Sequence, residues 1–175
     1  NSDLLLTSDK VWSLGDALVK IGDDAGNNPT LTIQAGTTLY GKVGGALIVQ
    51  RGAKINAIGT STNPVIMTGE GDVLVNATNR GQWAGLVIAG KAPNNNPTTE
   101  VSFEFETTLK HGGTEPTDNS GILQYVVVKH AGQSIVANKE FNAVTLGSVG
   151  SGTTIDYVEA YNGKDDGFEL FGGRV

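Results

Sequence analysis

The sequence predicts an all-β fold, a right-handed parallel β-helix in which short strands stack in successive coils of the chain. Three observations lead to this prediction: short apolar runs separated by turn residues, two internal self-matches, and few of the Asn-Gly or Asp-Gly pairs that make β-hairpins. Helical spacing of apolar residues does not persist over any window of a dozen residues. A β-sandwich is the alternative.

The expected strands are short runs of β-branched and other apolar residues, and turn-forming Gly, Asn and Asp lie between them. In chain order they cover residues 17–21, 31–33, 38–40, 47–49, 65–67, 86–88, 123–128, 144–146 and 155–158. Strands of this length fit a sandwich, a barrel or a solenoid. The presence of internal repeats is therefore the evidence that distinguishes a solenoid from the other two folds.

Two self-matches favour the solenoid. Residues 31–41 match residues 47–57 at an offset of 16, in the pattern apolar, any, apolar, Gln, any, Gly, any, any, apolar, and residues 86–90 resemble a further copy of its first half. Residues 123–126 align with residues 155–158 at an offset of 32. We expect coils of roughly 16 to 30 residues with two or three strands each, whose inward side chains form ladders about 4.8 Å apart.

Hairpin signals are too sparse to support the sandwich. Asn162-Gly163 and Asp166-Gly167 are the only Asn-Gly or Asp-Gly pairs near an expected strand, and they come too late in the chain to organise a meander.

Residues 1–175 are expected to form one β-helix domain with an inserted loop at about 91–121. The repeat pattern of the coils is interrupted there. The interruption consists of prolines and asparagines at 93–97, alternating apolar and polar residues at 101–106, and glycines at 112–113. The sequence ends in Gly-Gly-Arg-Val, where another strand would begin, so we also expect a fragment of a longer chain.

Composition excludes several classes of function. The 12 basic residues are outnumbered by 18 acidic ones without any basic cluster, which disfavours binding to nucleic acid or an anionic membrane. The chain has no cysteine and two histidines, so disulfides, thiolate zinc sites and histidine-rich metal centres are not expected. No apolar run approaches the roughly 20 residues that span a bilayer.

Several segments resemble a widespread group of secreted or surface-anchored bacterial β-helix proteins, mostly uncharacterised and known as hypothetical or lipoprotein-like proteins. The matching segments are residues 31–41, 46–60, 63–66, 83–93, 150–158 and 165–173. The resemblance implies a right-handed parallel β-helix and an extracellular or cell-surface location. It implies no catalytic residues.

An acidic turn at Asp165, Asp166 and Glu169 is the candidate metal site. Carboxylates closely spaced on a tight turn are the ligands that calcium requires, and calcium is the only cofactor that the sequence suggests. The alternative is structural, because Asp beside Gly stabilises the turns that a β-helix corner needs.

Phe103 and Phe105 in the inserted loop are the candidate contacts to a glycan or a protein partner, because loops on a rigid scaffold often carry recognition. The alternative is that both rings cover the flank of the β-helix.

The leading functional hypothesis is a noncatalytic extracellular module for structure or adhesion, which assembles head to tail through its open ends. A polysaccharide hydrolase or lyase is the enzymatic alternative, and a calcium-dependent glycan-binding module is the third. Hydrolysis would need two facing carboxylates, and a lyase would need a base. The candidate acids are Asp156, Glu159, Asp165, Asp166 and Glu169, and the candidate bases are Lys129, His130 and Arg174. No pair has a spacing diagnostic of a reaction, so no catalytic residue is assigned.

Overall fold

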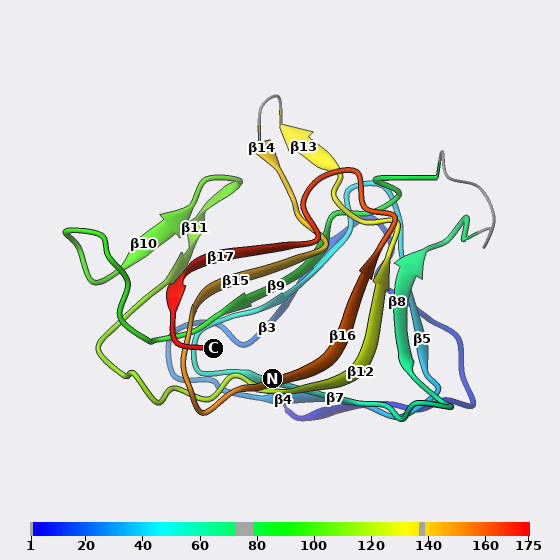
Figure 1. Ribbon diagram of the computed structural model, residues 1–175, viewed down its shortest axis with the longest axis horizontal. Helices are drawn as coiled ribbons and strands as arrows, with labels where there is room; N and C mark the ends of the chain where they lie inside the picture. The colour runs from blue at the N-terminus through cyan, green and yellow to red at the C-terminus, as the bar shows by residue number, and fades with distance from the viewer. Residues whose placement is uncertain (1, 73–78, 137–138) are drawn as a thin grey trace.

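The computed structural model describes residues 2–72, 79–136 and 139–175 and shows a parallel β-helix. Its strands form three faces around one apolar core, and Figure 1 views the coils end-on with β16 and β17 nearest. The described residues contain no helix that is long and apolar enough to cross a membrane.

Each face consists of parallel strands contributed by successive coils. The first face contains β1 (Leu4–Leu6), β4 (Thr30–Ile33), β7 (Lys54–Ile58) and the first halves of β12 (Gly121–Lys129) and β16 (Thr154–Tyr161). The second face contains β2 (Trp12–Ser13), β5 (Thr38–Gly41), β8 (Val65–Gly69) and the second halves of β12 and β16. The third face contains β3 (Leu18–Ile21), β6 (Ala46–Val49), β9 (Gly85–Ala89), β15 (Val144–Val149) and β17 (Phe168–Gly173). The chain therefore makes five coils.

Two antiparallel hairpins leave this stack. β10 (Val101–Phe103) and β11 (Glu106–His111) lie between β9 and β12, within the segment expected to be inserted. β13 (Ser134–Val136) and β14 (Lys139–Glu140) lie between β12 and β15. Both hairpins project from the outside of the coils (Figure 1).

The observed register confirms the parallel β-helix and the self-match at an offset of 32. Leu123 pairs with Ile155, and Leu86 pairs with Leu47, as the repeats predicted. The offset of 16 is wrong as a coil repeat, because residues 31–33 and 47–49 belong to different faces of one coil. Leu31 instead pairs with Ile55, 24 residues further along the chain.

The corners of the last two coils are single residues in the left-handed conformation. Tyr125 and Tyr157 have φ of 49° and 52°, and their parallel rings stack with centroids 4.4 Å apart at the corner between the first two faces. His130 and Asn162 occupy the next corner, with φ of 56° and 53°. Left-handed backbone strains residues other than glycine, so this geometry is held by the paired strands on either side.

The core fills the space between the three faces. Its ladders are mostly aliphatic, and Trp83 is the largest side chain that is completely buried. The indole Nε1 donates a hydrogen bond to the Lys129 carbonyl at 2.8 Å, which satisfies its one polar group. A methyl group at Gly41 would come within 2.9 Å of the indole ring, so glycine is needed where the ring crosses β5.

A second apolar cluster lies outside the coils. The hairpin β10–β11 covers the outer side of the third face, where Ile48 and Val87 contact Phe103 and Leu109. Arg51 fixes the base of this hairpin to the coils: it pairs with Asp24 through two hydrogen bonds of 2.6 and 2.8 Å and also binds Glu100 at 2.8 Å. The hairpin therefore has a defined position, and its free side borders a groove.

Candidate functional site

A groove of about 640 Å³ lies between the hairpin and the edge strand β17. Three segments line it: the loop after β9, the hairpin β10–β11, and β17. The lining residues are Pro93, Asn94, Asn95, Asn96, Val101, Ser102, Phe103, Glu104, His111, Leu170, Phe171, Gly172 and Gly173.

The loop at 94–96 is held in shape by its first asparagine. Asn94 Oδ1 accepts a hydrogen bond from the Asn96 amide at 2.9 Å, and Asn94 Nδ2 donates to the Thr99 carbonyl at 3.1 Å. The side chains of Asn95 and Asn96 are exposed at the groove. Asn94 therefore holds the loop in shape, and Asn95 and Asn96 present their side-chain amide groups to the groove.

Phe103 and Phe105 pack on the flank of the β-helix. Phe103 is only 2% exposed, and its ring centroid lies 4.6 Å from that of His111 and 5.9 Å from that of Phe171. Phe105 is partly buried, and its centroid lies 4.0 Å from that of Phe141. Phe103 is therefore a wall of the groove and a support of the hairpin, and contact of Phe103 or Phe105 with a partner stays a prediction.

His111 is buried behind Phe103 and contacts a strained serine. Its Nδ1 lies 2.9 Å from Ser148 Oγ, and Ser148 has a φ of 50° near the end of β15. Burial lowers the pKa of His111 to about 4, and the positive charge of Arg51 acts in the same direction. The imidazole is therefore neutral at pH 7.

The stability of the fold is expected to fall as the pH is lowered from 6.5 to 4. In this window the unfolded chain binds a proton at His111, whose ordinary pKa is 6.5, whereas the folded chain does not. The contribution of His111 to this loss should reach about 3 kcal/mol and be complete near pH 4. Urea unfolding at a series of pH values measures it, and in His111→Gln the slope in this window should shrink. An unchanged slope in that variant would assign the pH dependence to other groups.

The acidic turn predicted as a calcium site lies between β16 and β17. Asp165 and Asp166 are exposed, and Glu169 accepts a hydrogen bond from Asn142 Nδ2. Burial raises the pKa of Glu169, and the nearby charges of Glu104, Asp166 and Asp165 raise it further. In residues 2–72, 79–136 and 139–175, no three His, Cys, Asp or Glu side chains are grouped to hold a metal ion. Calcium binding stays a prediction, to be checked by melting the protein with calcium and with chelator.

The candidate catalytic residues lie on different parts of the molecule. Asp156 and Glu159 point outward from β16 on the first and second faces, whereas Glu169 points outward from β17 on the third. Arg174 is exposed after β17. The structure brings Glu169 near Glu104, an acid that the sequence did not single out.

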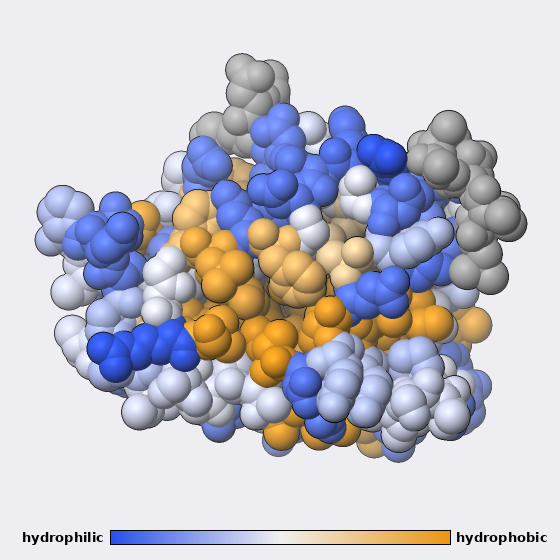
Figure 2. Space-filling model, viewed as in Figure 1, coloured by the Kyte–Doolittle hydropathy of each residue, from blue (hydrophilic) through white to orange (hydrophobic). Residues whose placement is uncertain are grey.

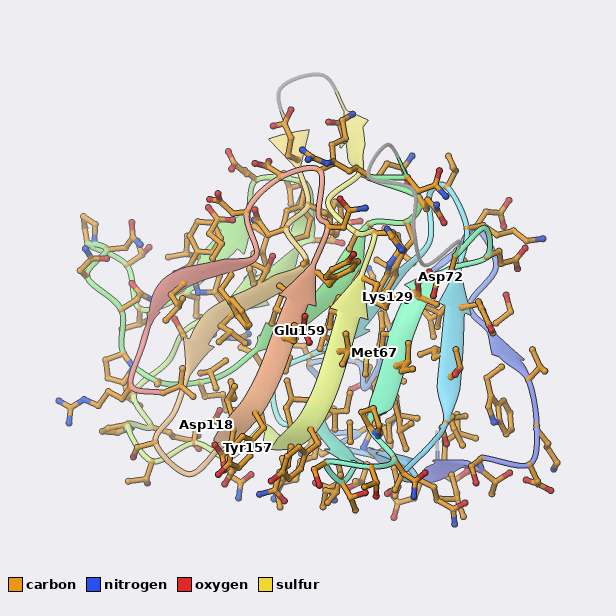
Figure 3. The ribbon with its side chains drawn as sticks, turned by 45° about the vertical axis from the view of Figure 1, so that its right-hand side comes forward. Met67, Asp72, Asp118, Lys129, Tyr157 and Glu159 are labelled. Atoms are coloured by element: carbon orange, nitrogen blue, oxygen red, sulfur yellow. The ribbon has the colours of Figure 1, made fainter. Side chains whose placement is uncertain are left out.

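Lys129 and His130, the other candidate bases, belong to a buried ionic cluster with Asp72. Lys129 Nζ lies 2.6 Å from Asp72 Oδ2, and His130 Nε2 lies 2.9 Å from Asp72 Oδ1. Figure 3 shows Asp72 and Lys129 side by side near the ends of β8 and β12. Asn162 Nδ2 donates to His130 Nδ1 at 3.1 Å, so Nε2 carries the ring proton and donates it to Asp72.

Burial disfavours the charge of Asp72, but hydrogen bonds from Lys129 and His130 outweigh it and lower the pKa of the carboxyl. Every polar group of this cluster is directed at another protein group. The arrangement therefore stabilises the corner after β12.

Sequence reasoning missed the groove and the role of Asp72. The run of three asparagines at 94–96 was a signal for the groove, because consecutive short amides in an interrupted segment indicate an ordered polar loop. Asp72 had no such signal, since its partners are 57 and 58 residues away along the chain.

The stacked faces and the outer groove define a parallel β-helix protein with a groove on its side. A family model described as "Pectate-lyase like beta helix domain" matches residues 1–175, and the chain belongs to this family. No curated protein and no solved structure matched the chain.

Proposed function

We propose that this chain is a noncatalytic β-helix module of the extracellular space or cell surface that binds a neutral glycan in the groove beside the hairpin. The observation that carries the proposal is the groove, whose volume of about 640 Å³ suits a small ligand. Membership of a pectate-lyase-like family supports a carbohydrate as the class of ligand. Binding of a surface glycan would give the module a role in adhesion.

The lining of the groove matches the chemistry of a sugar. The amides of Asn95 and Asn96 and the hydroxyl of Ser102 offer donors and acceptors to ring hydroxyl groups. Phe171 and Leu170 offer apolar surface to the C–H face of a sugar ring. This mixture of a few polar groups with apolar surface is typical of ligand sites.

The charge of the groove favours a neutral glycan over a uronic acid polymer such as pectate. Glu104 is its acidic residue, and its described lining contains no lysine or arginine. The chain as a whole has a net charge of −6, so an anionic polymer would be repelled as it approached.

The states of the nearby titratable groups support binding without cleavage. His111 Nδ1 contacts Ser148, and the ring has a pKa of about 4, far below that of a base matched to neutral pH. Lys129 and His130 are paired with Asp72. The observation that favours a hydrolase instead is the raised pKa of Glu169 beside Glu104, since such a carboxyl can act as a general acid.

Calorimetric titration with neutral and uronic acid oligosaccharides tests the proposal. We expect binding of a neutral oligosaccharide, roughly tenfold weaker in Asn95→Ala/Asn96→Ala because each lost amide contact costs on the order of 1 kcal/mol. Asn56→Ala is the matched control, because Asn56 lies outside the groove on the outer side of β7.

A reducing-sugar assay on the same oligosaccharides separates binding from hydrolysis. No cleavage is expected. Cleavage that disappears in Glu169→Gln would replace the proposal by the hydrolase, and equal weakening by the control variant would place the binding site elsewhere.

A further inference from the structure

Lys129 and Asp72 form a buried pair of an amine and a carboxyl group in the middle coils of the stack. They lie where β12 and β8 end, at the upper edge of Figure 1, and Figure 2 shows a mainly hydrophilic surface along that edge. The pair is covered there, because the two side chains are only 7% and 15% exposed. Lys129 Nζ lies 2.6 Å from Asp72 Oδ2. Reactive groups held in contact have an effective concentration far above any in solution, which favours a reaction between them.

His130 directs a hydrogen-bond donor at the other oxygen of the same carboxyl group. Its Nε2 lies 2.9 Å from Asp72 Oδ1, and its side chain is only 1% exposed. The hydrogen bond from Asn162 to Nδ1 fixes the ring proton on Nε2. A fixed donor in this position stabilises negative charge that develops on Oδ1.

A buried hydroxyl group lies on the same outer side of the second face. Met67 and Val128 pair with each other and point into the core. The next residues along the two strands, Thr68 and Lys129, therefore lie side by side and point outward. Thr68 is 0% exposed, and within the described part of the chain its Oγ1 has no hydrogen-bond partner. An amide N–H at Lys129 would be a donor of the kind that this hydroxyl lacks.

We propose that Lys129 and Asp72 condense spontaneously to a covalent amide bond. A proton first passes from the ammonium group to Oδ2, which leaves a neutral amine and a neutral carboxyl group. Nζ then attacks Cγ, and negative charge develops on Oδ1, to which His130 donates. The bond from Cγ to Oδ2 breaks, Oδ2 takes a second proton from Nζ and leaves as water, and Oδ1 becomes the amide carbonyl oxygen. One water molecule is lost, and no oxidant or cofactor is consumed.

The surroundings favour the amide but make its formation slow. A buried amide carries no charge, and exclusion of water protects it from hydrolysis. Burial disfavours the charge of Asp72, yet the hydrogen bonds from Lys129 and His130 lower the pKa of its carboxyl group, so the neutral form is scarce. Freshly folded chain therefore holds the ion pair and converts over time, and this ion-paired state is the reference for the stability of variants at Asp72.

The amide bond would join two consecutive coils. Its ends are 57 residues apart along the chain, so it closes a loop that contains β9 and the hairpin β10–β11. Because a cross-link restricts the unfolded chain, the linked form should unfold at a higher urea concentration than freshly folded chain. This inference goes beyond the proposed function and does not depend on a ligand in the groove.

Mass spectrometry of the 175-residue chain, directly after folding and after prolonged incubation at pH 7, tests the proposal. A growing fraction of molecules should lose the mass of one water molecule. Trypsin should then release residues 55–80 joined to residues 111–139, since cleavage after Lys129 is blocked. Lys129→Arg keeps the positive charge but lacks the reactive amine, so it should lose no water. His130→Phe removes the donor and should slow the conversion at least roughly tenfold.

The site of the water loss separates the amide from other products. A cyclic imide at Asp166-Gly167 would also lose one water molecule, but hydroxylamine opens an imide and leaves the amide intact. Lys42→Arg is the matched control, because Lys42 pairs with Glu70 at 3.5 Å in an exposed ion pair, and it should convert as the original does.

The joined peptide of the original chain decides the outcome even if Lys129→Arg fails to fold. An unchanged mass after incubation, a water loss that hydroxylamine reverses, or a loss that persists in Lys129→Arg would overturn the proposal.

Discussion

Asp72→Asn is expected to lower the free energy of unfolding by about 3–5 kcal/mol, because it leaves the ammonium group of Lys129 buried without its counter-charge. The Lys129 side chain is only 7% exposed, and Asp72 is its partner at 2.6 Å. Asparagine keeps the shape of the aspartate side chain, so the loss of stability measures the effect of removing the carboxylate charge. Urea unfolding at pH 7 measures it.

The double variant Asp72→Asn/Lys129→Met is the control for this prediction. It removes both charges and retains an apolar chain of similar length, so most of the lost stability should return. If the double variant is as unstable as Asp72→Asn, the effect comes from the hydrogen bond to His130 and not from the ion pair.

Phe103→Ala is expected to lower the free energy of unfolding by about 3–5 kcal/mol, since it leaves a cavity between the hairpin and the third face. A methyl group at Gly147 would come within 2.3 Å of the Phe103 ring, which shows how closely the ring lies on the coil. The hairpin should lose its fixed position. Glycan binding should weaken with it, because β10 forms one wall of the groove.

Phe168→Ala is the matched control, measured in dilute solution. It removes the same side chain from a position that is 41% exposed, and it should cost less than about 1 kcal/mol. A loss in Phe103→Ala no larger than in this control would mean that the hairpin contributes little to the stability of the coils.

The strands of the coils could be predicted because each is a short run of β-branched and other apolar residues that can be read from the local sequence alone. Each expected run, from residues 17–21 to 155–158, overlaps an observed strand of the three faces. β7 was missed as a strand because Lys54 and Asn56 alternate with its apolar residues, and β1 and β2 are too short to give a periodic signal. The strands of the two hairpins were missed because they are polar and pair only locally.

The candidate site was harder to predict, because it depends on contacts between distant residues. Phe103 was a candidate contact because it lies in an inserted loop, and the sequence left open whether its ring instead covers the flank of the β-helix. His111 and Ser148 are 37 residues apart, and their contact exists only because the hairpin folds back over β15. The three asparagines at 94–96 are a local signal for the groove, whereas the low pKa of His111 has no signature in local sequence.

The register of the third face has a consequence for protein engineering. Leu86 pairs with Val144 although the chain between them is longer than the chain between Val19 and Leu47, so the hairpin β10–β11 leaves the stack without shifting its register. Lengthening such a loop costs only about 0.6 kcal/mol for each doubling. The turn between β10 and β11 is therefore a suitable site for grafting: other recognition loops inserted there, with Phe103 and Leu109 kept, would be displayed on an unchanged scaffold.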